Sequence, residues 1–143
     1  LGHEDGRIAV DLSRGALGWT EEIARALSSI HDRVQELNIS GVEIETADWA
    51  ALAPALTSLE VLVAAHTVLG DEGLLPPGAF ARLRILNLFS TSISDTSLPR
   101  LLQLPALERI YLTGTNVTPQ AAAALATRGV QVHLQQGALL EAR

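Results

Sequence analysis

A spacing of apolar residues that recurs about every 24 positions is the feature that most limits how this chain folds. The pattern places apolar or small side chains at relative positions 0, 3, 5 and 10, and three of its four copies have threonine at position 8. The copies start at Val34, Leu59, Leu83 and Leu107, at intervals of 25, 24 and 24 residues. A period in the twenties with this spacing is typical of stacked units that each contribute one strand. Because one unit cannot bury its own apolar face, neighbouring units must pack together.

The segment LRILNLFSTSISD, which starts at Leu83, is the fullest copy of the pattern. It resembles the leucine-rich repeat, a family whose repeats read L-x-x-L-x-L and place Asn, Cys or Thr at the ninth residue. The longer form, which continues with I-x-D and then L-x-x-L-x-x-L, is similar to bacterial and F-box-associated repeats. The resemblance covers residues 34–134 closely and 7–33 loosely. It implies an α/β fold: a right-handed leucine-rich-repeat solenoid, with a short parallel sheet on the concave side and helices on the convex side.

The same pattern predicts how the chain is divided. We expect a single domain over residues 1–143, with four repeats in 34–129. Residues 1–33 are interpreted as a degenerate N-terminal cap repeat, in which Val10 and Leu12 take positions 3 and 5. Residues 130–143 are expected to form a last strand near 130–134, whose register the sequence leaves open. The tail after it either covers the final sheet edge or is frayed.

Capping residues mark the expected helices. Thr118-Pro119 predicts a helix start, because threonine is a good N-cap and proline suits the first helical position, and Gly129 predicts the end of that helix. Two further helices are expected to follow threonine N-caps at Thr20 and Thr46. The pair Pro76-Pro77 cannot continue a helix, so the connection that contains it is expected to be irregular.

Strand residues that lie between the inward-facing leucines are expected to form the functional surface. Side chains alternate along a strand, so those at positions 2 and 4 point away from the core, and we place those at 6 and 7 on the same face. Contiguous exposed apolar surface usually marks an interaction site, and Tyr and Arg are frequent anchors at interfaces. The predicted partner-binding residues on this concave face are Glu36, Val61, Val63, His66, Ile85, Phe89, Arg109 and Tyr111. Five of them are expected to form one apolar patch: Val61, Val63, Ile85, Phe89 and Tyr111.

This surface predicts a non-catalytic protein–protein interaction module, whose partner is another protein or a segment of the parent chain. One alternative is a structural subunit or spacer of a larger protein or assembly, which uses its ends or convex face while its own chain covers the patch. Another is an enzyme or effector whose catalytic domain is a neighbour of this one.

Catalytic motifs are missing from the sequence. It contains no G-x-S-x-G, no H-E-x-x-H, no phosphate-binding glycine loop and no cysteine. The cluster His3-Glu4-Asp5 has no second group to complete a metal site. We therefore expect no enzyme activity, no cofactor and no metal.

Charge and composition narrow the class of partner. The net charge of −6 argues against nucleic acid, which needs a basic surface. Residues 1–72 hold thirteen acidic side chains and four arginines, a net of −9, whereas residues 73–143 hold three and six, a net of +3. Such asymmetry can orient a partner, although a solvated acidic surface on the first half is the favoured explanation. No apolar run is long enough to span a membrane, so no membrane association is expected.

The start of the chain and its cysteine content bear on origin and compartment. The sequence begins at Leu1 and contains no methionine, so we expect a processed product or an excerpt of a longer protein. No basic segment followed by an apolar one opens the chain, so no signal peptide is expected. The absence of cysteine favours a reducing compartment, and we expect a cytoplasmic, intracellular protein.

Overall fold

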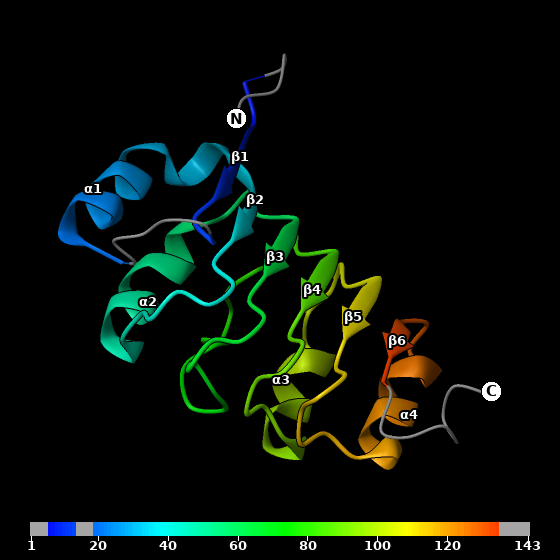
Figure 1. Ribbon diagram of the computed structural model, residues 1–143. Coiled ribbons are helices and arrows are strands. Elements are labelled where there is room, and N and C mark those ends of the chain that lie inside the picture. The colour runs from blue at the N-terminus through cyan, green and yellow to red at the C-terminus, as the bar shows by residue number, and fades with distance from the viewer. Residues whose placement is uncertain (1–5, 14–18, 135–143) are drawn as a thin grey trace.

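A six-stranded parallel sheet organises the chain, in a computed structural model that describes residues 6–13 and 19–134. The strands lie side by side in chain order, and Figure 1 shows them as one continuous row. The protein is therefore α/β. The strands are β1 (Ile8–Asp11), β2 (Val34–Asn38), β3 (Val61–Val63), β4 (Ile85–Asn87), β5 (Arg109–Tyr111) and β6 (Gln131–His133).

Helices lie on one side of this row of strands (Figure 1). The α-helices are α1 (Glu21–Ile30), α2 (Thr46–Leu52), α3 (Leu98–Leu102) and α4 (Pro119–Thr127). Short 3-10 turns follow α1 and α2 and precede α3: His31–Arg33, Ala53–Ala55 and Asp95–Ser97. The connection between β3 and β4 contains only turns, which confirms the irregular geometry predicted from its two prolines. None of the helices in the described residues has the length and apolar character needed to span a bilayer.

Strand pairing follows the sequence spacing. Glu36 pairs with Val61, Val61 with Ile85 and Ile85 with Arg109, at separations of 25, 24 and 24 residues. Arg109 pairs with Gln131, only 22 residues further on, because the connection through α4 is shorter. This pairing fixes the register of the last strand, which the sequence left open.

The core lies between the sheet and the helices. One paired residue of each inner strand lies in a row that is fully buried: Leu37, Leu62, Leu86 and Ile110. From the helical side, Trp49 fills the space behind these strands and donates a hydrogen bond from Nε1 to the Leu74 carbonyl at 2.9 Å. Its ring centroid is 6.2 Å from that of Phe80, which is also buried. Most of the stability arises from this apolar burial.

Polar side chains form hydrogen bonds with backbone groups in the turns after β3, β4 and β5. The threonine hydroxyl at position 8 donates to the carbonyl three residues earlier, at 2.6 to 3.0 Å; these residues are Thr67, Thr91 and Thr115. The segment after β3 is also joined to the segment after β4 by Asp71, whose carboxylate accepts hydrogen bonds from the hydroxyls of Ser94 and Ser97 at 2.6 Å. Burial raises the pKa of Asp71, but the hydrogen bonds from Ser94 and Ser97 outweigh it and leave the pKa below its usual value.

Two of the three predicted threonine caps are confirmed. The side chains of Thr20 and Thr118 accept hydrogen bonds from backbone N–H groups in the first turns of α1 and α4. The prediction for Thr46 is wrong by one residue, because Thr46 is already helical and Glu45 is the N-cap. The carbonyl of Glu45 accepts the first helical hydrogen bond, from Trp49 N at 3.0 Å. The predicted C-terminal tail and the cluster His3-Glu4-Asp5 lie outside the described residues.

Candidate interaction surface

The face of the sheet that is directed away from the helices, the outer face, carries most of the predicted binding residues. Two rows of paired strand residues form it, on either side of the buried central row. The first row is Glu36, Val61, Ile85 and Arg109, and the second is Asn38, Val63, Asn87 and Tyr111. Their side chains are half-buried or exposed, and the alternation predicted from the spacing is confirmed by this burial pattern. Six of the eight predicted binding residues therefore lie in these two rows.

The apolar part of the outer face is centred on β3 and β4. Val61 pairs with Ile85, and Val63 extends the apolar surface along β3. In the second row, however, Asn87 lies between Val63 and Tyr111. The predicted apolar residues thus share one face, but an amide separates Tyr111 from the valines.

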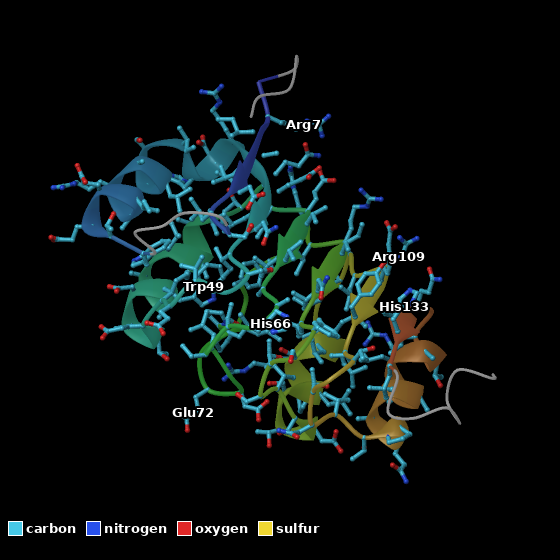
Figure 2. The ribbon with its side chains drawn as sticks, viewed as in Figure 1. Arg7, Trp49, His66, Glu72, Arg109 and His133 are labelled. Carbon is cyan, nitrogen blue, oxygen red and sulfur yellow. The ribbon has the colours of Figure 1, made fainter. Side chains whose placement is uncertain are left out.

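Phe89 and His66, the remaining two predicted residues, follow the ends of β4 and β3. Phe89 is 41% exposed, and its ring meets that of His66 edge to face, at a centroid distance of 5.2 Å. Figure 2 shows His66 near the middle of the molecule, where β3 leads into the next connection. The sequence prediction that Phe89 points out of the core is confirmed.

His66 also has an unusual backbone. Its φ is +57°, in the left-handed region, and the matching position after the neighbouring strands has the same conformation. Two of these matching residues are glycines, Gly41 and Gly114, and the third is Ser90. A residue with a Cβ costs about 1–2 kcal/mol in this region, so glycine is favoured there. The chain nevertheless has His66 in this position, against Phe89, and residues held in such strained backbone often belong to functional sites.

Side chains of Asp and Asn in the second row stabilise the turns after the strands. The side-chain oxygens of Asn38 and Asn87 each accept a hydrogen bond at 3.0 Å from the backbone N–H two residues later, at Ser40 and Phe89. Asp11 in β1 does the same for Ser13 at 2.9 Å. Val63 has no acceptor in its side chain, and the Tyr111 hydroxyl is at the far end of the ring, too distant from its own backbone to accept such a bond. The local turn therefore does not explain why these two residues are apolar and aromatic.

Tyr111 is paired with a residue that was missing from the predicted set. Its ring stacks on that of His133 in β6, with centroids 4.4 Å apart and planes at 14°. His133 Nε2 is buried and has no hydrogen-bond partner among the described residues. The sequence did not identify His133 because its place in the row depends on the shorter 22-residue spacing before β6. The β5–β6 end of the outer face thus presents Arg109, Tyr111 and His133; Figure 2 labels the first and last of these.

A shallow depression marks the opposite end of the outer face. It has a volume of about 210 Å³ and lies over β1, β2 and β3. Its walls include three of the predicted residues, Glu36, Val61 and Val63, together with Asp11. The outer face is therefore acidic and hollowed at the β1–β2 end, apolar in the middle, and aromatic and basic at the β5–β6 end.

Charged residues at the start of the strands form a separate chain of ion pairs. Arg84 lies between Glu60 and Glu108, at 3.3 and 3.0 Å, and Arg7 lies 3.8 Å from Glu60. The hydrogen bond from Arg84 is the main reason why the pKa of Glu108 is lowered, and the same contact raises the pKa of Arg84. Because these groups largely neutralise one another, the charge pattern of the outer face depends mainly on Asp11 and Glu36 at one end and Arg109 at the other.

The described residues contain another hollow away from the sheet. It has a volume of about 450 Å³ beside the start of α2, and its lining includes Trp19, Glu43 and Val68, whose side chain is 69% exposed. No group of three or more His, Asp or Glu side chains within residues 6–13 and 19–134 is arranged to hold a metal ion. Comparison with protein-family models and with curated proteins finds no match for this chain.

Proposed function

We propose that this chain is a non-catalytic binding module that recognises another protein through the outer face of its sheet. The proposal includes the finer description of the fold as a right-handed solenoid of leucine-rich-repeat type, with the outer face concave. One observation supports it most: the exposed ring of Phe89 lies against His66. His66 has left-handed backbone, and the matching position is glycine after two of the other strands.

The composition of the outer face supports binding of a protein. Covering Phe89 and its apolar neighbours would contribute only part of the about 1.5–3 kcal/mol that full burial of an exposed side chain gives, because Phe89 is 41% exposed and Val61, Val63 and Ile85 are half-buried. Aromatic residues and arginine carry much of the energy at protein interfaces, and here Phe89, Tyr111 and Arg109 lie on one face. A polar rim surrounds the valines and isoleucine, as in specific interfaces of ordinary size.

The backbone of the surface is held in place before any partner arrives. Phe89 N donates to Asn87 Oδ1, and the N–H of His66 donates to the Phe89 carbonyl at 3.0 Å. The N–H of Ser90 donates in turn to the Thr113 carbonyl at 2.9 Å. Such preorganisation lowers the entropy lost on binding, which favours binding without rearrangement of the backbone.

Affinity capture with matched variants tests the proposal. The immobilised chain would be exposed to a lysate of its source, and bound proteins quantified by mass spectrometry. Phe89→Asp should abolish recovery of the partner, while Val68→Asp, which places the same charge on the other large apolar side chain exposed in residues 6–13 and 19–134, should leave it unchanged. Circular dichroism would establish that both variants fold. Equal recovery with both folded variants would remove the outer face as the binding surface and favour a structural role.

A further inference from the structure

Two charges of opposite sign face outward in the same row of the sheet. Glu36 lies in β2 and Arg109 in β5, separated by Val61 and Ile85 on the intervening strands. Both side chains are exposed. The carboxylate of Glu36 has no hydrogen bond or ion pair with any described residue. Among those residues, the guanidinium of Arg109 donates to the neutral Gln131 Oε1 at 3.3 Å, and its charge also helps to lower the pKa of Glu108.

The depression next to Glu36 has the chemistry that suits a basic side chain. Val61 and Val63 supply apolar walls, and Glu36 and Asp11 supply carboxylates at the same opening. Lys and Arg bury their aliphatic stems against apolar surface and keep the charged end near water or a carboxylate. An acidic or phosphate-bearing ligand would be repelled from this end of the face.

The spacing of the two charges sets the length of the segment that joins them. Glu36 and Arg109 are three strand spacings apart, or about 14 Å at about 4.8 Å per spacing. An extended peptide advances about 3.3 Å per residue, so about four residues cover this distance. Because side chains alternate along an extended segment, the residue midway between its two charges would lie over Val61 and Ile85 and would therefore be apolar.

We propose, resting on the function proposed above, that the partner presents an extended segment with a Lys or Arg and an Asp or Glu about four residues apart, and with an apolar residue midway between them. The basic side chain enters the depression beside Glu36, and the acidic one pairs with Arg109. The two charges fix the direction in which the segment crosses the strands, because reversal would place like charges together at both ends.

Selection from a displayed library of random twelve-residue peptides tests this directly. The full chain is the bait, and the affinities of enriched peptides are measured by calorimetry. Enriched peptides should carry the basic–apolar–acidic pattern, and Glu36→Arg or Arg109→Glu should each weaken binding by about tenfold or more. The same charge changes on the exposed face of α1, Glu22→Arg and Arg25→Glu, serve as controls and should leave affinity within about twofold.

A charge-swapped bait separates failure of this inference from failure of the proposed function. Glu36→Arg combined with Arg109→Glu should select peptides in which the basic and acidic residues have exchanged places along the chain, and should bind the original peptides poorly. Peptides whose binding requires Phe89 but which show no charge pattern would overturn the inference and leave the proposed function unaffected. The same holds for peptides that bind the charge-swapped bait with unchanged affinity. Peptides that bind Phe89→Asp unchanged would overturn both. Binding seen only after removal of residues 135–143 would identify the chain's own tail as the occupant, which also refutes the inference.

Discussion

Gly114→Ala should destabilise the protein more than Gly41→Ala, although both glycines occupy the same place after their strands. Both have left-handed backbone, with φ of +79° and +74°. A Cβ at Gly41 would meet no atom within 4 Å, whereas a Cβ at Gly114 would lie 3.2 Å from both Cα and N of Ser90. The first substitution therefore introduces backbone strain alone, and the second adds a contact with backbone that cannot move aside.

The two effects can be estimated separately. Left-handed strain costs about 1–2 kcal/mol of folding free energy. Alanine also lowers the conformational entropy of the unfolded chain, which stabilises the folded state by about 0.4–1 kcal/mol. Gly41→Ala should therefore lose about 1 kcal/mol. The contact with Ser90 adds about 1–2 kcal/mol of overpacking, so Gly114→Ala should lose about 2–3 kcal/mol. Ser90→Gly relieves strain in the neighbouring turn and should gain up to about 1 kcal/mol.

Urea unfolding followed by circular dichroism measures all three variants on one scale. Each 1 kcal/mol should also move the thermal midpoint by about 3 °C in a chain of this length. Equal losses at Gly41 and Gly114 would contradict the close stacking of neighbouring turns. A gain in stability at Gly41 would contradict the left-handed backbone itself.

The core and the contacts between units give three further predictions. Trp49→Phe leaves the Leu74 carbonyl buried without its donor and should lower the free energy of unfolding by about 1–3 kcal/mol in urea titrations. Leu86→Ala should lose about 2–5 kcal/mol in the same assay, clearly more than Ile85→Ala on the outer face. Asp71 has a lowered pKa in the folded state, so its contribution is present above about pH 4 and is lost as the pH falls through the folded value. Asp71→Asn should therefore be less stable than wild type at pH 7, and the difference should shrink in unfolding curves recorded towards pH 3; a gap that does not change with pH would refute this reasoning.

Much of the sheet could be predicted because the signal is local and repeated. Every inner strand needs an apolar residue at the same place, so Leu62, Leu86 and Ile110 mark three strands in one register. The outward direction of Phe89 follows from the same alternation. The cap at Thr118 and the proline at the start of α4 also have purely local reasons, which is why that prediction held.

Other features depend on partners far away in the sequence and could not be read from it. The stacking of Tyr111 on His133 requires the register of β6, which a connection two residues shorter than the others determines. The left-handed backbone at His66 and Ser90 was hidden because neither residue is glycine, although the glycines at the matching positions were a usable signal. The separation of Val63 from Tyr111 by Asn87 follows from the 24-residue pairing and was overlooked in favour of a single patch.

Native-state labelling of single introduced cysteines tests most directly which side chains leave the core. The chain has no cysteine, so each variant reports on one position. Cysteine at Ile85 or Phe89 should react rapidly with a maleimide under native conditions, whereas cysteine at Leu86 or Leu88 should react only as fast as the protein unfolds. Rapid labelling at Leu86 together with protection at Ile85 would show that the strands present the opposite side chains to solvent, and the outer face would then lack the residues on which binding depends.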